Sequence, residues 1–153
     1  MSRQLIRLLI ALTIISLNAA TSAFAQSNDL NWSDVSREIE VTLKDLKNPA
    51  LTTKVRLLRI QSQKEASGAL FQELLITKKY ESPGEEAQFA NAYQNIAALT
   101  TLSKIQLGKD GKATANSCAG VRSMLTASQQ TANDEQTVEI EKDFNEVWAL
   151  ICQ

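Results

Sequence analysis

Apolar residues recur at helical spacing along most of the chain, and this periodicity predicts an all-α fold. The first helix is expected to begin at Asn31 or Ser33, both good capping residues, and to end near Lys47. Its apolar positions share one side of the helix and are Trp32, Val35, Ile39, Leu43 and Leu46. Asn48 as an N-cap, followed by Pro49 at the first helical position, predicts that a second helix begins directly afterwards.

Residues 49–80 are less regular and leave three interpretations: one kinked helix, two helices, or a β-hairpin. Gly68 predicts a kink or a break, because glycine costs about 1 kcal/mol relative to alanine inside a helix. The hairpin would pair residues 54–61 with 69–80. The apolar stripe of the helical interpretation is Leu51, Val55 and Leu58, resumed by Ala66, Leu70 and Leu74.

A third helical stretch starts at Ser82, which can act as the N-cap, with Pro83 at the first helical position. We expect this helix to extend to about Leu107. Its apolar face is rich in alanine and consists of Phe89, Ala92, Tyr93, Ile96, Leu99 and Leu102. Small side chains permit close approach, so this helix should lie centrally in the fold, or pack against a second copy in a homo-oligomer. A polar loop, Gly108–Lys112, follows it.

The last two helices are predicted to form an antiparallel hairpin. Asn116 and Ser117 can cap the first of them, over residues 118–131, and the second covers residues 134–151. The second helix has one narrow apolar stripe, consisting of Ile140, Phe144, Val147, Trp148 and Ile151. A short turn between two helices of similar length brings their far ends together.

The two cysteines of the chain, Cys118 and Cys152, stand at those far ends. This placement predicts a disulfide, which would stabilise the fold by roughly 3–4 kcal/mol. A redox-active pair is disfavoured, because the chain has no C-x-x-C motif and no histidine to lower a thiol pKa. The predicted fold class is therefore all-α: a four- to five-helix bundle with a C-terminal helical hairpin closed by one disulfide.

Residues 1–25 have the pattern of a cleaved secretory signal peptide. Arg3 and Arg7 precede an apolar run, and Ala23-Phe24-Ala25 provides the small residues expected before a cleavage site. The mature chain would begin at Gln26 and form a single helical domain over residues 26–153. An uncleaved membrane anchor is the competing interpretation, but the apolar run is short for a bilayer span. The signal is bacterial in style, which predicts the periplasm first and secretion to the medium second.

Composition excludes several kinds of chemistry. The chain has no histidine, which removes Ser-His and Cys-His catalysis and His-ligated zinc or haem. Two cysteines are too few for an iron–sulfur cluster or a Cys-only zinc site. We therefore expect no cofactor, no metal and no enzymatic activity. Without Arg3 and Arg7, the 16 basic residues become 14 against 17 acidic ones, a mildly negative balance that disfavours nucleic acid as a partner.

Acidic residues gather on the last helix, and this face is the predicted partner-binding site. Like charges one turn apart are mildly unfavourable in an isolated helix, so a cationic partner surface would relieve them. The pattern is more typical of a solvent-exposed face that lies beside the basic residues of the second helix, within residues 54–64. The four acidic residues of the candidate site are Glu135, Glu139, Asp143 and Glu146.

A small apolar ligand is the alternative to a protein partner. It would occupy a cavity between helices, lined by Phe89, Tyr93, Ile96 and Trp148. The leading expectation is a small exported protein that binds or inhibits a protein partner, such as an immunity or inhibitor protein against an envelope-targeted toxin or enzyme. The second is a carrier or sensor of a small ligand.

Overall fold

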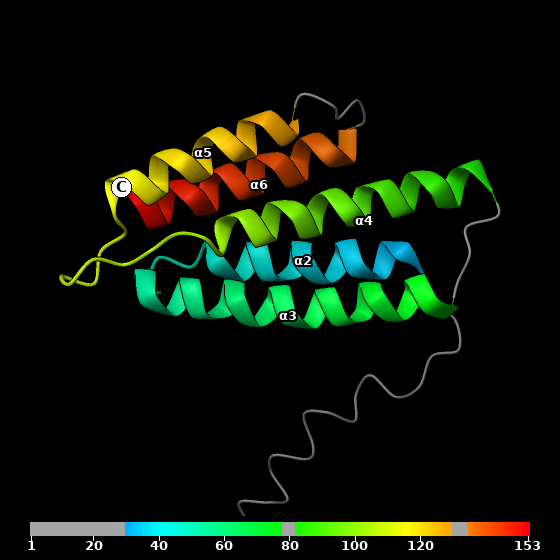
Figure 1. Ribbon diagram of the computed structural model, residues 1–153, viewed down its shortest axis with the longest axis horizontal. Helices are drawn as coiled ribbons and strands as arrows, with labels where there is room; N and C mark the ends of the chain where they lie inside the picture. The colour runs from blue at the N-terminus through cyan, green and yellow to red at the C-terminus, as the bar shows by residue number, and fades with distance from the viewer. Residues whose placement is uncertain (1–29, 78–81, 130–134) are drawn as a thin grey trace, which may run out of the picture. The chain divides into compact units, whose positions relative to one another are not determined.

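A computed structural model describes residues 30–77, 82–129 and 135–153, and the predicted signal peptide lies outside these residues. Asn31–Gln153 form one compact unit of five helices (Figure 1). The predicted all-α bundle is confirmed. The helices are α2 (Trp32–Leu46), α3 (Thr53–Thr77), α4 (Pro83–Leu102), α5 (Ala115–Gln129) and α6 (Glu135–Cys152).

α2 and α4 lie at the centre of this unit. Both helices pack against α3 on one side and against α6 on the other, and α4 also contacts α5. The α5–α6 hairpin therefore covers α2 and α4 on the side away from α3 (Figure 1). The central position predicted for the alanine-rich third helix is thus observed. In the part of the chain that the structure describes, no helix combines the length and apolarity needed to cross a membrane.

The start and the buried side of α2 agree with the sequence prediction. The Asn31 side chain accepts hydrogen bonds from the backbone of Ser33 and Asp34, at 2.9 and 3.3 Å. Asp34 in return accepts the Asn31 backbone N–H at 2.8 Å, which completes a capping box. All five predicted core residues are buried: Trp32, Val35, Ile39, Leu43 and Leu46.

Asn48 and Pro49 do not start the second helix, and this prediction is wrong. Asn48 instead closes a turn, because its side chain accepts the Ala50 N–H at 3.0 Å and its carbonyl accepts the Leu51 N–H at 3.1 Å. The helix begins four residues later, at Thr53. The residues after Asn48 form this turn, so its side chain stabilises the turn and not the first turn of α3.

α3 is one continuous helix of 25 residues, so both the β-hairpin and the break at Gly68 are wrong. The predicted apolar stripe is also largely wrong, because Val55 and Leu58 point to solvent and Leu58 is 60% exposed. Polar side chains occupy part of the inward side, where hydrogen bonds hold them. The buried residues of α3 are Arg56, Ile60, Ser67, Phe71 and Leu74.

α4 begins as predicted but ends earlier than expected. Pro83 is its first residue, and the Ser82 hydroxyl accepts the Glu85 N–H at 3.3 Å. The helix ends at Leu102 instead of Leu107. Tyr93, expected on the apolar face, is 60% exposed, and Asn95 is buried in the core near it.

Candidate functional site

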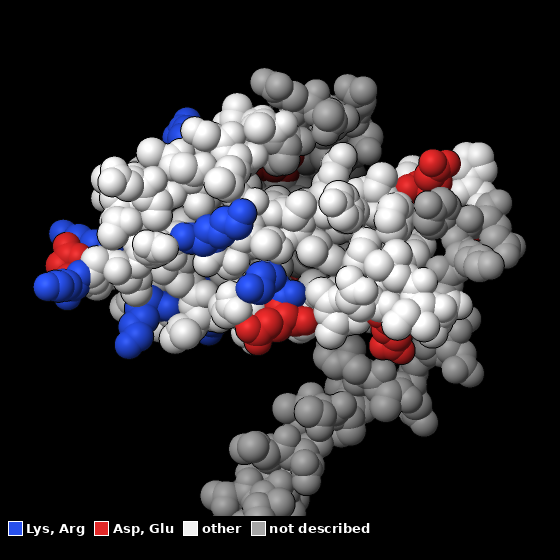
Figure 2. Space-filling view, in the orientation of Figure 1, with Lys and Arg blue, Asp and Glu red and all other residues white. Residues whose placement is uncertain are grey.

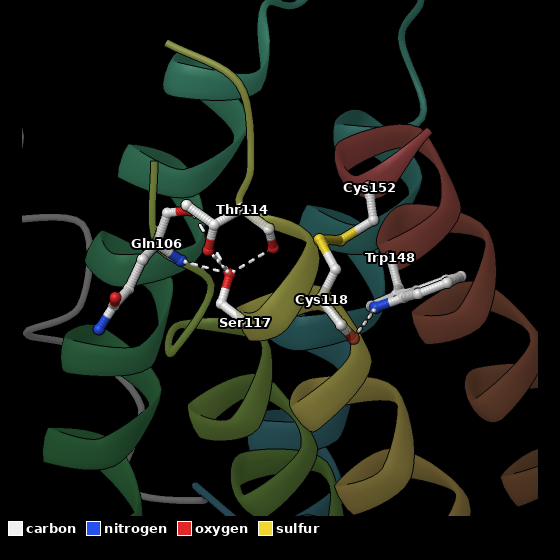
Figure 3. The surroundings of a disulfide bond; sticks show 6 residues. All are labelled: Gln106, Thr114, Ser117, Cys118, Trp148 and Cys152. Atoms are coloured by element: carbon white, nitrogen blue, oxygen red, sulfur yellow. Dashed lines mark hydrogen bonds between the residues drawn. A yellow bond between two sulfur atoms is a disulfide. The ribbon is translucent and has the colours of Figure 1, made fainter. Parts of the chain in front are cut away.

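The α5–α6 hairpin is closed by the predicted disulfide. The Cα atoms of Cys118 and Cys152 lie 5.8 Å apart, and the bond joins the first turn of α5 to the last residue of α6. Trp148, one turn before Cys152, donates its indole N–H to the Cys118 carbonyl at 3.0 Å (Figure 3). A covalent bond and a hydrogen bond therefore fix the same ends of the two helices.

The segment between α4 and α5 is an ordered turn. Leu107 and Ala113 pair as an isolated antiparallel bridge. Inside it, the Gly108 N–H donates to the Lys112 carbonyl at 2.8 Å. Gly111 has a φ of 76°, a conformation that glycine adopts without steric cost. The predicted polar loop is thus a small hairpin-like turn that carries its charged side chains into solvent.

Hydrogen bonds of the Ser117 side chain connect this turn to α5. The expected capping role of Asn116 and Ser117 is wrong, because the helix already begins at Ala115. The Ser117 hydroxyl instead accepts the Gln106 N–H at 3.1 Å and the Thr114 hydroxyl at 2.8 Å (Figure 3). The first turn of α5 is therefore held by the disulfide on one side and by Ser117 on the other.

The acidic residues predicted to bind a partner have different surroundings. Asp143 is only 5% exposed and forms an ion pair with Lys47, directly after α2. Glu146 is half-buried, and its carboxylate lies 2.6 Å from the same ammonium group. Glu139 is exposed, and the side chain of Glu135 lies outside the described part of the chain. Asp143 and Glu146 already have a cationic partner inside the molecule.

The cation that meets these acids was not the one expected. The sequence suggested the basic residues of the second helix, but α6 packs against α2, α4 and α5 and less against α3. Arg56 of that basic group is buried, and its guanidinium donates to the carbonyls of Leu46, Asn48 and Leu51 at 2.9, 2.9 and 2.6 Å. It holds the turn between α2 and α3 together.

The ion pairs shift the pKa of Lys47 and that of Glu146. Burial lowers the pKa of Lys47, but hydrogen bonds to Asp143 and Glu146 outweigh this and raise it above 10.5. The hydrogen bond with Lys47 lowers the pKa of Glu146 below 4.5. Burial alone raises the pKa of Glu141 on the same helix. The contact of Lys47 with Asp143 and Glu146 thus contributes to the packing of α6 on α2.

Phe89 and Tyr93, two residues of the predicted ligand cavity, belong to an aromatic cluster with Trp32 and Phe71. The Phe89 ring centroid lies 5.0 Å from that of Trp32, 5.6 Å from that of Phe71 and 6.4 Å from that of Tyr93. Trp32 and Phe71 are buried in the core, whereas Tyr93 is exposed. The cluster thus extends from the core to the surface of α4.

The other two cavity residues, Ile96 and Trp148, are both half-buried. The described ring contact of Trp148 is with α5, where the Arg122 guanidinium carbon lies 4.6 Å from the ring centroid. The aromatic contacts therefore divide the predicted set between two places. A ligand cavity lined by all four residues stays a prediction.

Arg122 is a residue that the sequence analysis missed. It is exposed, and it is the only charged residue between Ala113 and Gln129. Beside it, the outer side of α5 has a shallow depression of about 580 Å³. The lining residues are Ala119, Arg122, Ser123, Thr126 and Ala127. The isolated charge of Arg122 is visible in the sequence. The contact that fixes its guanidinium is not, because Trp148 is 26 residues away.

The surface around this depression carries little charge. α4 has no charged residue between Ala87 and Leu102, and Figure 2 shows a mostly uncharged surface over α4 and α5. We call these outward side chains the neutral face. Its exposed members include Ala87, Gln88, Ala90, Tyr93, Asn116, Ala119, Ser123, Met124, Thr126 and Ala127, with Arg122 as its charged residue.

Among the described residues, no three His, Cys, Asp or Glu side chains are grouped so that they could hold a metal ion. Comparison of the chain with protein-family models, with curated proteins and with solved structures finds no match. Function is therefore argued from the surface and the contacts described above.

Proposed function

We propose that this protein is exported to an oxidising compartment, the periplasm first, and that it acts there by binding a protein partner. An inhibitor or an immunity protein, which occupies a toxin or an enzyme of the cell envelope, would act in this way. The alternative compartment is the extracellular medium. Binding, not catalysis, is proposed because the chain has no histidine, and because Asp143 and Glu146 are neutralised by Lys47.

The neutral face of α4 and α5 is the observation that carries this proposal. The cores of protein–protein interfaces are depleted in charged residues and enriched in aromatic residues, methionine and arginine. The neutral face has few charges, and it exposes Tyr93, Met124 and Arg122. Its alanine and serine side chains would let a partner approach the helix backbones closely. The acidic face of α6, proposed from the sequence, supports the contact less, because two of its three described carboxylates, those of Asp143 and Glu146, are paired with Lys47.

The disulfide supports the proposed export to an oxidising compartment. Disulfides persist in secreted and periplasmic proteins and are rare in the cytosol of mesophiles. The bond between Cys118 and Cys152 agrees with the export signal predicted from residues 1–25. It also fixes the start of α5, so the neutral face would meet a partner with little rearrangement. A surface that is rigid before binding loses less entropy on association.

Native mass spectrometry of the tagged mature chain, purified gently from the envelope of its native host, tests the proposal. We expect a second protein to be retained in a fixed stoichiometric ratio. Tyr93→Ala, on the neutral face, should weaken retention about tenfold, since exposed tyrosines are frequent hot spots. Val41→Ala on α2 is the matched control, because it removes an exposed apolar side chain elsewhere. A chain that carries only a small-molecule mass, or no partner, would contradict the proposal.

A further inference from the structure

We propose that Arg122 is the recognition residue of the neutral face, and that its guanidinium receives an aspartate or glutamate carboxylate of the protein partner. This inference rests on the proposed function and makes it specific. It concerns the middle of α5 and one type of partner side chain. The structural reasons are the way Arg122 is held, the absence of an ion pair for it among the described side chains, and the chemistry of its neighbours.

Arg122 is held in place by a chain of contacts that begins at the disulfide. The bond to Cys152 fixes the backbone of Cys118. The Cys118 carbonyl accepts the indole N–H of Trp148, which sets the orientation of the ring (Figure 3). The Arg122 guanidinium then lies over this ring, its central carbon 4.6 Å from the centroid. A cation over a tryptophan face is stabilised, so the guanidinium is positioned before any partner arrives.

The stacked guanidinium has free hydrogen-bonding capacity. Among the side chains that the structure describes, Arg122 takes part in no ion pair, whereas Arg37 pairs with Asp34 and Lys47 pairs with Asp143. Stacking uses the face of the guanidinium and leaves N–H groups at its edge. These groups match the two oxygens of a carboxylate in geometry and in charge.

The neighbouring hydroxyl groups restrict the hydrogen-bonding groups that the partner can present here. Ser123 donates to the Ala119 carbonyl at 3.2 Å, and Thr126 donates to the Arg122 carbonyl at 3.0 Å. Their protons are therefore occupied inside α5, and only their oxygen lone pairs face a partner. These oxygens accept N–H groups, such as those of a partner backbone. The depression thus fits a peptide segment that presents one acidic side chain and free amide groups.

The net positive charge of the surrounding segment favours the same acidic kind of partner. From Ala87 to Gln129 the chain has four basic residues and one acidic residue, Asp110. Lys104 lies beside this surface, with its ammonium 3.9 Å from the Met124 sulfur. An acidic segment is attracted to such a region and a basic one is repelled.

Arg122→Met tests the inference first, because methionine keeps an unbranched apolar chain and removes the charge. The partner retained by the wild-type protein should bind at least about tenfold more weakly to this variant. Arg59→Met is the matched control, since Arg59 is an exposed arginine of α3. It should bind as the wild type does, and thermal melting would show that both variants are folded.

Arg122→Lys then identifies the partner group. A carbodiimide joins an amine to a carboxylate only when the two are in contact, so the amine of R122K becomes a reporter of a bound acid. Envelope extract treated in this way should contain a peptide in which position 122 is linked to an Asp or Glu of another protein. Arg59→Lys, on α3 and away from the neutral face, is the control position.

The outcomes separate the two proposals. Loss of the partner with R122M, together with a carboxylate link at position 122, supports the inference. Equal retention by R122M and wild type overturns it and leaves the proposed function standing. A loss without any carboxylate link, or a link to a second copy of this chain, also overturns it. If the wild-type protein itself retains no partner, the proposed function fails and this inference fails with it.

Discussion

Ser36 and Ser67 are both buried between helices, at 3% and 1% exposure, but their hydroxyl groups differ. Ser67 accepts the Gln63 amide at 2.7 Å, and Gln63 in turn accepts the Thr42 hydroxyl at 2.7 Å. The Ser36 hydroxyl has no hydrogen-bond partner among the described residues. A buried hydroxyl without a partner costs stability.

Ser36→Ala should therefore raise the free energy of unfolding, by about 1 kcal/mol. Ser67→Ala is the matched comparison and should lower it by a similar amount, because the Gln63 amide loses its acceptor. Urea unfolding of the three proteins measures both changes. A loss of stability in S36A would show that the Ser36 hydroxyl is hydrogen-bonded in solution.

Arg56 stabilises the fold without an acidic partner in the described structure. Its three hydrogen bonds satisfy carbonyl groups at the end of α2 and in the following turn. Arg56→Met should lower the free energy of unfolding by about 2–4 kcal/mol, because three carbonyls lose a charged donor. Arg59→Met, one turn away and exposed, should change it by less than about 0.5 kcal/mol. Equal effects in a denaturant titration would mean that the contacts of Arg56 contribute no more than surface charge.

At the scale of the helices, α2 and α6 were predictable and α3 was not. α2 and α6 each bury a single stripe of large apolar residues, so periodicity alone identifies the inward side. α3 has leucines on both sides, and Arg56 occupies an inward position because it donates to carbonyls of α2 and the following turn. Ser67 is buried beside Gln63 of the same helix, and Gln63 in turn accepts the hydroxyl of Thr42 in α2. Such long-range hydrogen bonds leave no mark in the local pattern, which is why the predicted stripe was placed on the wrong side.

The candidate site also has features that could be predicted from the sequence and features that could not. The disulfide could be predicted, because two cysteines stood at the ends of a recognisable helical hairpin. The pairing of Asp143 with Lys47 could not, since the two residues lie 96 positions apart. Arg122 was overlooked for a similar reason. Its single charge is visible in the sequence, but its fixed position depends on Trp148 in the next helix.

The contact between α2 and α6 should depend on pH. The pKa of Glu146 is lowered by Lys47, so its stabilising effect is present above 4.5 and is lost as the pH falls through the lowered pKa. The pKa of Lys47 is raised, so its effect is complete below 10.5 and is lost only above that value. The contribution of these ion pairs should therefore be constant between about pH 5 and pH 10.

Lys47→Met measures this contribution. At pH 7 it should destabilise the protein by about 2 kcal/mol, between the values for exposed and buried pairs, because Asp143 is left buried without a cation. Below pH 4 the difference from wild type should shrink as Glu146 becomes protonated. Lys44→Met, on the exposed side of α2, should show a smaller effect at pH 7. A Lys47→Met deficit that stays the same at pH 3 and pH 7 would contradict the assignment.

At the scale of the whole molecule, the disulfide agrees with the export predicted from the sequence, because disulfides persist in oxidising compartments. The sequence predicts cleavage after Ala25. The intact mass of the chain recovered from a periplasmic extract should correspond to a protein that begins at Gln26. Ala25→Leu should block cleavage and leave the precursor mass. A full-length mass for the wild-type chain would instead support a retained anchor.

The disulfide should stabilise the whole molecule by restricting its unfolded state. It links residues 34 positions apart, and closing a loop of that size corresponds to about 4 kcal/mol in the chain-entropy model. The double variant Cys118→Ala, Cys152→Ala should therefore unfold at lower urea concentration, with a larger dependence on urea because its unfolded chain exposes more surface. Wild type in reductant should match the variant if the bond, and not the packing of the cysteines, is responsible. The same variant should also free the first turn of α5 and with it the position of Trp148. If the variant were as stable as the oxidised protein, the helices would be held by their apolar contacts alone, and the disulfide would serve only to fix the end of the hairpin.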